Sequence, residues 1–398
     1  MPAVPMLAER CETPRGGATN APLRLLHVVA GNLYGGVERM LATIASHQSA
    51  CTGSHHEFAV CFPGRVQDEL MALGATVHGL GHARFSRPWT VLSARRRLRS
   101  IIAAERFDVV LFHGCWPLAT LGWRTASTGC RSVLWLHDAV RGRHWVERLA
   151  RRRHVDHFVA NSRWVLECAT RWRPGVPGEA ICCPVELPAH PLPRSGRVRR
   201  EFGCRDETVV IVQVSRLEEW KGHRRLIDAA RRLRASHSNL PAWEIWFVGG
   251  PQRPHEAEYL TALQREVAAA QLTDVVRWLG PRRDVDEILA DADVFCQPNL
   301  SPEPLGIVFL EAMAQGLPIV STDFGGAREL VPPSAGRLIP PDDTAAIAEA
   351  LAQLTGDAAQ RASMQSAGPG HARRLADPAA RLKDLERLLA VPVTGGRA

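Results

Sequence analysis

Residues 294–321 have the sequence VFCQPNLSPEPLGIVFLEAMAQGLPIVS, and the pattern of this stretch decides the fold. The run Val294–Gln297 predicts a short buried strand, and Gly306–Gln315 predicts a helix with an almost entirely apolar surface. A second short run, Ile319–Ser321, predicts another strand soon after the helix ends. A strand, a helix and a second strand in succession are typical of a parallel sheet, because the helix returns the chain to the starting edge.

The same alternation continues over most of the 398 residues, a length that suits two domains of ~200 residues or fewer. In the first half, strands are expected at Leu25–Ala30, Phe58–Phe62, Val109–Phe112, Val133–Leu136 and Phe158–Ala160, and helices at Val37–His47, Trp89–Ala104 and Arg163–Arg171. In the second half, further strands are expected at Val209–Val214, Ile245–Val248 and Val275–Leu279, and helices at Arg224–Ala235, Glu256–Ala270 and Val285–Ala290. The sequence therefore predicts an α/β protein with two Rossmann-like, doubly wound domains that face each other across a cleft.

Six prolines interrupt the pattern between Arg173 and Arg200, and such a stretch is typical of a linker between domains. The N-terminus is polar and rich in proline and glycine, which predicts disorder. The predicted divisions are a disordered N-terminus (1–22), a first domain (23–185), a linker (186–205), a second domain (206–372) and a C-terminal helix that could cross back onto the first domain (373–398).

Charge is unevenly distributed along the chain. Residues 1–200 contain 27 arginines, no lysine and 14 acidic residues, whereas residues 201–398 contain 22 basic and 27 acidic residues. A basic first half suggests an anionic partner: a phosphate-bearing ligand, an anionic membrane surface or a nucleic acid. A nucleic acid is disfavoured, because the chain has no signature of a nucleic-acid-binding fold and few interleaved aromatic residues. The arginine-rich helices at 93–99 and 146–153 favour contact with anionic lipid, although such runs are often simply a solvated surface.

The ten cysteines are scattered and form no Cys-x-x-Cys pair, so they predict reduced thiols in a cytosolic protein. The N-terminus has no apolar core of a signal peptide, and no apolar run reaches the ~18 residues that a membrane span needs. The expected location is therefore the cytoplasm, with peripheral attachment to the inner face of the membrane as a hypothesis.

One turn in each half follows the first strand and is suited to an anion. Gly35 and Gly36, in GNLYGGVE (31–38), allow backbone N–H groups to approach an anion at a helix N-terminus. This segment is neither a G-x-G-x-x-G fingerprint nor a P-loop, which argues against a dehydrogenase and an NTPase. In VSRLEEWKG (214–222), Arg216 and Lys221 are two cations at a strand end, which suits a diphosphate. A packing turn and ordinary surface cations are the plainer alternatives.

Glu303 and Glu311 are candidate ligand-binding acids. Glu311 lies inside the apolar helix, where an acid is costly unless it is paired or used. Eight helical residues would separate the two by roughly 12 Å, whereas the paired acids of glycosidases lie about 5–9.5 Å apart. The spacing therefore favours two separate contacts, one for each sugar ring of a ligand. The free N–H groups at the Gly306 end of the helix can bind phosphate. Two solvent-exposed glutamates are the alternative.

Together these segments resemble the family 4 retaining glycosyltransferases, which have the GT-B fold. The shared features are Gly-Gly-x-Glu after the first strand, Ser-Arg-Leu-x3-Lys-Gly at 215–222, Glu303 and Glu311 followed by Gly-x-Pro, Gly249-Gly250-Pro251, Phe324-Gly325-Gly326 with Glu329, and Ala160-Asn161-Ser162. The resemblance covers residues 23–354, and the order and spacing of the motifs make it specific. One departure is Leu305, where the family often has Phe.

The resemblance implies a role for each matching residue. Arg216 and Lys221 would bind the donor diphosphate and stabilise the leaving group. Glu303 would hold the donor sugar near its anomeric carbon, and Glu311 would hold the ribose. The other expected contacts are the backbone of Gly35 and Gly36 with diphosphate or acceptor, the amides of Gly306 and Ile307 with phosphate, Leu305 beside the donor, Arg282 and Arg283 at the base, and His137, with His113 as a second candidate, near the donor sugar.

The family implies transfer of a sugar, with retention, from a UDP- or GDP-sugar to a hydroxyl of a saccharide or lipid-linked acceptor, in polysaccharide or glycolipid biosynthesis. The first domain would bind the acceptor and the second the nucleotide sugar. Catalysis would rest on positioning and on electrostatic stabilisation of the developing phosphate charge. No Asp-x-Asp lies in a suitable loop, so neither a metal nor another cofactor is expected. A sugar-nucleotide epimerase of the same fold and a non-catalytic sugar-nucleotide-binding protein remain alternatives.

Overall fold

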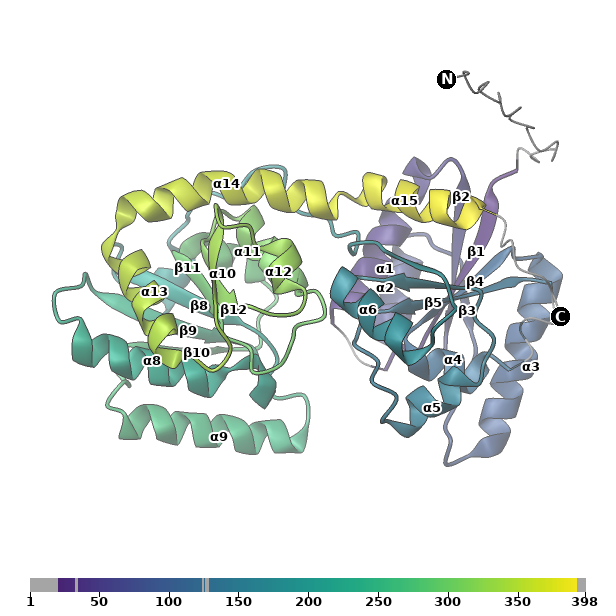
Figure 1. The fold of residues 1–398 in the computed structure, drawn as a ribbon, viewed down its shortest axis with the longest axis horizontal. Helices are drawn as coiled ribbons and strands as arrows, with labels where there is room; N and C mark the ends of the chain where they lie inside the picture. The colour runs from purple at the N-terminus through teal and green to yellow at the C-terminus, as the bar shows by residue number, and fades with distance from the viewer. Residues whose placement is uncertain (1–20, 33–34, 124, 126–128, 392–398) are drawn as a thin grey trace, which may run out of the picture.

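The computed structural model describes residues 21–32, 35–123, 125 and 129–391, and two sheets form its two lobes (Figure 1). The first sheet contains, in spatial order, β3 (Val77–Gly79), β2 (Ser54–Val60), β1 (Leu23–Val29), β4 (Val109–His113), β5 (Arg131–Leu136), β6 (His157–Ala160) and β7 (Gly178–Ala180). The second contains β10 (Val276–Gly280), β9 (Trp243–Val248), β8 (Val209–Val214), β11 (Val294–Gln297), β12 (Ile319–Thr322) and β13 (Gly336–Ile339). All of these strand pairs are parallel. The disorder predicted for residues 1–22 falls almost entirely outside the described residues.

Helices cover both sheets. Those of the first domain are α1 (Gly36–Ser46), α2 (Arg65–Ala72), α3 (Pro88–Glu105), α4 (Cys115–Leu121), α5 (Trp145–Arg151) and α6 (Arg163–Trp172). Those that follow are α7 (Arg197–Glu201), α8 (His223–Ser236), α9 (Pro254–Ala269), α10 (Val285–Asp291), α11 (Ile307–Ala314), α12 (Ala327–Leu330), α13 (Thr344–Gly356), α14 (Ala358–Ala376) and α15 (Pro378–Ala390). In the part of the chain that the structure describes, no helix combines the length and the apolar character needed to cross a bilayer.

The predicted apolar runs form the central strands, because those strands are buried on both faces. Within β1, Leu25 and Val29 pack into one core, and Leu26 and Val28 pack into the core on the opposite face. Consecutive buried residues of this kind are typical of parallel strands that lie between two layers of helices. The predicted α/β GT-B fold with two Rossmann-like, doubly wound domains is confirmed.

Three of the four strands at the sheet edges are not indicated by the sequence pattern, whereas the fourth, β10, lies at the predicted strand Val275–Leu279. β3, β7 and β13 have only three or four residues, and each includes a glycine. β7 lies inside the proline-rich stretch and pairs with β6, so this part of the stretch belongs to the first sheet. An edge strand pairs on one side only, and it can therefore be short and lack a continuous apolar run.

The segment predicted as a linker also contains α7, which packs against the second domain. Arg199 of α7 is fully buried and forms an ion pair with Asp293, with 2.6 Å between Nη2 and Oδ2. Asp291 accepts hydrogen bonds from the backbone N–H groups of Gly196 and Val198. The two aspartates of Asp291-Ala292-Asp293 are therefore occupied in holding this segment.

The C-terminal helices pass from the second domain to the first (Figure 1, yellow). α14 packs against α11, and Asp377 then caps α15, with its Oδ1 accepting from the backbone N–H of Ala380 over 2.8 Å. α15 packs beside α1, and Glu386 accepts a hydrogen bond from the backbone N–H of Gly53 over 3.1 Å. Arg131 at the start of β5 donates to the carbonyls of the last turn of α15.

Candidate active site

A cavity of about 560 Å³ lies between the two domains and is lined by both. Its lining residues from the first domain include Gly35, Gly36, Glu38, Arg39, His137, Asp138 and Asn161. Those from the second domain include Ser215, Arg216, Trp220, Lys221, Gln297, Glu303, Leu305, Gly306, Ile307 and Glu311. These residues follow the carboxyl ends of β1, β5, β8 and β11, which is where open parallel sheets bind ligands. Ten of the thirteen predicted site residues therefore line one cavity.

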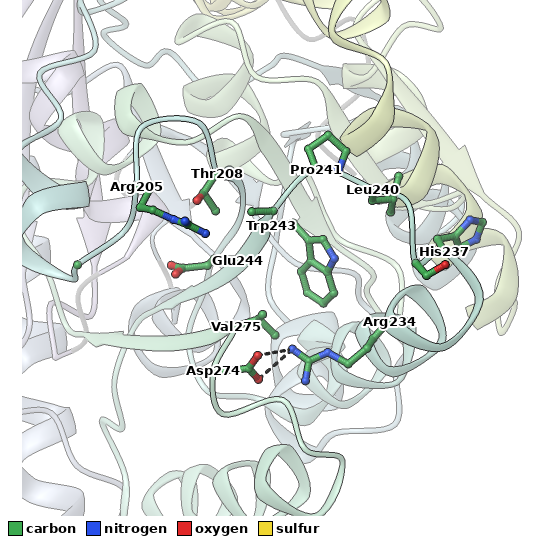
Figure 2. Close-up of a pocket in the computed structure, with 13 residues that line it drawn as sticks. Arg205, Thr208, Arg234, His237, Leu240, Pro241, Trp243, Glu244, Asp274 and Val275 are labelled. Atoms are coloured by element: carbon green, nitrogen blue, oxygen red, sulfur yellow. Dashed lines mark hydrogen bonds and ion pairs between the residues drawn. The ribbon is translucent and has the colours of Figure 1, made fainter.

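A second cavity, of about 360 Å³, lies at the opposite ends of the strands in the second domain (Figure 2). It is lined by Thr208 and Trp243 at the starts of β8 and β9 and by Arg234 at the end of α8. Arg234 already forms two hydrogen bonds with the carboxylate of Asp274, at 2.7 and 2.9 Å (Figure 2). This cavity is therefore at the amino ends of the strands, and its ion pair needs no ligand.

Lys221 and Glu303 form a buried ion pair inside the interdomain cavity. Lys221 Nζ lies 2.6 Å from Glu303 Oε2, and the two side chains are 11% and 9% exposed. The side-chain amides of Gln297 and Asn299 donate to the same oxygen, each over 3.2 Å. Burying two charges costs more solvation than their attraction usually returns, so such a pair is weak evidence for a stabilising role. None of the three contacts uses Glu303 Oε1, which suits that oxygen to accept from a ligand hydroxyl.

The backbone around Glu303 is held by the Phe324-Gly325-Gly326 motif. Glu303 and Gly325 form an isolated parallel bridge, and the Gly326 N–H donates to the Glu303 carbonyl over 2.7 Å. A Cβ on Gly325 would lie 2.4 Å from that carbonyl oxygen, so a side chain cannot be accommodated without a backbone shift. The motif that the resemblance includes therefore positions the acid of the cavity.

Arg216 lies at the end of β8 and is half exposed toward the cavity. Its Nη1 is 3.0 Å from Glu218 Oε1, and it also lies close enough to Glu38 of the first domain to lower the pKa of that acid. Burial has the larger effect on Glu38 and raises its pKa above the ordinary value. Arg216 therefore faces acids from both domains, and a diphosphate between the domains would find a cation there.

The N-terminus of α11 points its first backbone N–H groups at the same cavity. Gly306 is the residue before the helix, and Ile307 is its first residue; both line the cavity, as does the buried Leu305. Free N–H groups and the helix dipole favour an anion at this position. The helix starts at Ile307, so Glu303 lies outside it, and the two glutamates are not on one helical face.

Glu311, on α11, forms an ion pair with Arg39 of α1 across the domain boundary. The Glu311 side chain is 9% exposed, and burial raises its pKa, while the neighbouring Arg39 lowers it. The predicted acid is thus paired rather than solvent-exposed. A ribose that binds Glu311 would have to share this carboxylate with Arg39.

His137 lines the cavity, whereas His113 lies behind it and does not. His113 Nδ1 and His137 Nε2 are 3.0 Å apart. Burial lowers the pKa of His137 to about 3, and it lowers the pKa of His113 well below the ordinary value. Both rings are therefore neutral at neutral pH and can exchange hydrogen bonds with hydroxyl groups but cannot supply a positive charge. The predicted direct contact of His113 with a ligand is corrected to a contact with His137.

Arg282 and Arg283, predicted to border a nucleotide base, do not line the cavity. Arg282 forms ion pairs with Glu201 of α7 and with Asp284, which lie on its own side of the second domain. This pairing holds the pKa of Asp284 well below its ordinary value. The arginine therefore serves the packing of α7, which a sequence pattern cannot distinguish from ligand binding.

Two further motifs of the resemblance, Ala160-Asn161-Ser162 and the Phe324-Gly325-Gly326 motif with Glu329, contribute contacts between the domains. Ser162 Oγ donates to the Pro304 carbonyl over 2.6 Å. Glu329 of the second domain accepts from the backbone N–H groups of Arg163 and Trp164, at 2.9 and 3.0 Å. An acid at the first turn of α6 is favoured by the helix dipole. These contacts hold the domains together on one side of the cavity.

Sequence reasoning missed several polar residues of the site. Gln297 and Asn299 support Glu303, Arg39 pairs with Glu311, and Asp138 follows His137 in the lining. Gln297 and Asn299 lie only six and four residues before Glu303, so their closeness to that acid in the sequence could have indicated them. No sequence pattern indicates that Arg39 belongs to the site, because its partner Glu311 lies in the other domain.

Family models match both halves of the chain. The model described as Glycosyltransferase Family 4 matches residues 34–187, and the model described as Glycosyl transferases group 1 matches residues 196–371. Solved structures with the same fold include HepE of Anabaena in complex with UDP and glucose, at a TM-score of 0.79 and 22% identity over 92% of this chain and 99% of that one. Sucrose-phosphate synthase of Thermosynechococcus elongatus has a TM-score of 0.75 and 18% identity over 92% and 99% of the two chains.

Two curated relatives match different lengths of this chain, 46% and 68%. The GDP-mannose-dependent monoacylated alpha-(1-6)-phosphatidylinositol monomannoside mannosyltransferase of Corynebacterium glutamicum is 34% identical over 192 residues, and this chain spans about half of its length, 47%. The GDP-mannose-dependent alpha-(1-6)-phosphatidylinositol monomannoside mannosyltransferase of Mycolicibacterium smegmatis is 31% identical over 291 residues, which are 68% of this chain and 73% of that protein. With this relative, the two family models and the fold in agreement, the chain belongs to the family 4 retaining glycosyltransferases with the GT-B fold.

Proposed function

We propose that this protein is a retaining glycosyltransferase that transfers a sugar from a nucleoside diphosphate sugar to an acceptor hydroxyl. The observation that supports this most directly is the grouping of Arg216, Lys221 and the N-terminus of α11 around Glu303 in one interdomain cavity. Two cations and free backbone N–H groups suit a diphosphate, and a buried carboxylate suits the hydroxyls of a sugar.

The chemistry needs no protein nucleophile. The bond between the anomeric carbon and the diphosphate oxygen breaks, and the acceptor oxygen forms a bond to that carbon from the same face. The acceptor proton passes to the departing phosphate oxygen. Arg216, Lys221 and the α11 N–H groups would stabilise the negative charge that develops there, and closely apposed domains would exclude water. Positive charge from these groups needs no metal, so transfer should persist in EDTA.

UDP- and GDP-sugars are both candidates for the donor, so both should be tested. The two curated relatives described above are named GDP-mannose-dependent, whereas HepE was solved with UDP. A thermal-shift screen of UDP- and GDP-sugars tests binding, because a ligand at 100 times its Kd stabilises the folded protein by about 2.7 kcal/mol. If no nucleotide sugar shifts the transition, the proposal is rejected. If the donor isomerises without any acceptor, the protein is an epimerase instead.

The acceptor that we propose is a glycolipid at an anionic membrane surface on the cytoplasmic side. The relatives named above act on phosphatidylinositol mannosides. On α3 of this chain, Trp89 and Leu92 are 66% and 51% exposed, and the exposed Arg96 follows on the same helical face. Trp145 of α5, 51% exposed, packs edge-on against Phe85, which lies three residues before the start of α3. Exposed aromatic residues next to arginine suit the interface of an anionic bilayer.

Vesicle flotation tests the membrane contact. The protein should float with vesicles that contain phosphatidylglycerol and not with pure phosphatidylcholine. The double substitution Trp89→Ser with Leu92→Ser should abolish flotation. Arg231→Gln, at an exposed arginine of α8 in the second domain, is the matched control and should have no effect. Absence from both kinds of vesicle would remove the membrane from the proposal, while the nucleotide-sugar screen would remain independent of this result.

A further inference from the structure

Four histidines form a diagonal row across the first sheet. His56 lies on β2, His27 on β1 and His113 on β4, and His137 directly follows β5. In the strand register, each histidine lies two residues beyond the position that pairs with the preceding one. Side chains alternate between the faces of a sheet, so steps of two residues keep all four rings on one face. The row begins near the amino ends of the strands and finishes at the interdomain cavity.

The four rings are linked by hydrogen bonds in one consistent orientation. His56 Nδ1 lies 2.8 Å from His27 Nε2, His27 Nδ1 lies 2.8 Å from His113 Nε2, and His113 Nδ1 lies 3.0 Å from His137 Nε2. Every ring therefore directs Nε2 away from the cavity and Nδ1 toward the next ring. Neutral imidazole has one donor nitrogen and one acceptor nitrogen, so one choice of tautomer fixes all the others.

The far end of the row reaches the helix that crosses between the domains. His56 Nε2 lies 2.9 Å from Ser54 Oγ, and Ser54 Oγ donates to Glu386 Oε1 of α15 over 2.7 Å. The backbone N–H of Gly53 donates to the same carboxylate oxygen. Ser54 is 3% exposed, and His56 and His27 are fully buried.

Glu386 decides the direction of the hydrogen bonds, because an ionised carboxylate can only accept. The single hydroxyl hydrogen of Ser54 goes to Glu386, so Ser54 must accept from an N–H at His56 Nε2. The same choice then repeats at each ring, and His137 donates from Nε2 to His113. Burial lowers the pKa of all four histidines, so no ring takes a second proton at neutral pH.

This direction leaves the last nitrogen of the row as a bare acceptor. His137 Nδ1 is buried and has no hydrogen-bond partner among the described residues, and His137 lines the interdomain cavity. A buried acceptor without a partner costs free energy, and so does a polar row in a sheet that could be apolar. A ligand hydroxyl in the cavity would complete the row.

We propose that Glu386, through Ser54 and three buried histidines, fixes the tautomer of His137 so that Nδ1 accepts a hydrogen bond from a hydroxyl of the bound sugar. The identity of the ligand as a sugar rests on the proposed function; the tautomer does not. Glu386, Ser54, His56, His27 and His113 are positioning residues, since they act through His137.

The tautomers are measured by NMR of protein with ¹⁵N-labelled histidine and no ligand, because protonated and bare ring nitrogens have well-separated shifts. The expected result is the Nε2–H form at the four histidines of the row. Glu386→Leu removes the acceptor, so the hydroxyl hydrogen of Ser54 becomes free to go to His56 Nε2, which should populate the opposite tautomer along the row. Arg387→Gln, at the next residue of α15, whose partner is Glu179, is the control and should leave the tautomers unchanged. A proton on Nδ1 of His137 in the wild type, or unchanged tautomers in Glu386→Leu, would overturn the proposal.

The kinetic test uses transfer from the nucleotide sugar identified in the screen. A typical hydrogen bond is worth roughly a fivefold change in an equilibrium constant, so Glu386→Leu and Ser54→Ala should each lower kcat/KM about fivefold while the protein remains folded. In His137→Asn, the further change Glu386→Leu should have no effect, because both act through one side chain. Additive losses would overturn the proposal. A protein with ordered tautomers but no affinity for any nucleotide sugar would reject the proposed function instead.

Discussion

The two domains build their sides of the cavity in different ways. The second domain provides Arg216 and Lys221 from one turn after β8, and Glu303 from a loop directly before α11. The first domain provides His137, and the atoms that orient it lie on three other strands and on the last helix. Each site residue of the second domain thus lies in a short motif after the end of a strand, whereas the residues behind His137 in the first domain come together only through strand register.

Net charge is a poor guide to which domain binds the anion. The first half of the chain holds the excess of arginine, yet the two cations beside Glu303 come from the acidic second half. Arg39 of the first domain lines the cavity but is paired with Glu311. The position of a cation in the fold therefore matters more than the net charge of its domain: Arg216 and Lys221 follow the carboxyl end of β8, in the same cavity as Glu303.

The largest effect is expected when the Lys221–Glu303 ion pair of the second domain is removed. Lys221→Met should lower transfer roughly a thousandfold, since a donor to developing charge is worth 10²–10³ in rate. Glu303→Gln should lower transfer by a similar factor, because it removes the carboxylate that is proposed to hold the donor sugar. Each single change also leaves one buried charge unpaired, which should cost roughly 3 kcal/mol of unfolding free energy. Turnover with saturating donor and urea unfolding measure the two effects.

The double variant Lys221→Met with Glu303→Gln is the control for that test. It has no unpaired charge, so it should be inactive but more stable than either single variant. Near-normal turnover in any of the three would show that the second domain does not provide the reacting machinery. A double variant less stable than both single variants would show that the pair is held for stability.

How much of the site the sequence could predict follows from the same difference. Glu303, Lys221 and Arg216 were predictable, because each lies in a short motif at the end of a strand with a clear apolar pattern. The histidine row was not, since four single histidines on separate strands have no spacing in common until the register is known. Arg282 lies outside the cavity lining, and the sequence could not indicate this because a cation in a loop is equally suited to α7 and to a ligand. Three edge strands, β3, β7 and β13, were missed because an edge strand needs no apolar run.

A smaller effect is expected from a substitution of Gly222, the residue that follows Lys221. Gly222 has a φ of +79°, and a Cβ there would lie 1.9 Å from the Pro298 carbonyl oxygen. Gly222→Ala should therefore cost roughly 3 kcal/mol and reduce transfer at least tenfold, because Pro298 and Asn299 adjoin the support of Glu303. Gly203→Ala is the matched control: its φ is +67° with open space around the Cβ, so only the left-handed backbone cost of roughly 1–2 kcal/mol applies. Equal losses of stability in the two variants would show that close packing at the turn is unimportant.

The smallest effect is expected at the ion pair between Arg39 of the first domain and Glu311 of the second. Burial raises the pKa of Glu311 and Arg39 opposes that rise, so Arg39→Met should raise the pKa further. A protonated carboxyl binds ribose hydroxyls less tightly than a carboxylate does. Nucleotide affinity, measured by calorimetry over a pH series, should therefore fall on acidification in both proteins, but the fall should begin at a higher pH in Arg39→Met and reach a few-fold. Glu311→Gln has no proton to gain and should remove the dependence. If Arg39→Met and the wild type gave the same pH profile, the first domain would not tune this acid, and its contribution to the site would be confined to His137 and the glycine turn of α1.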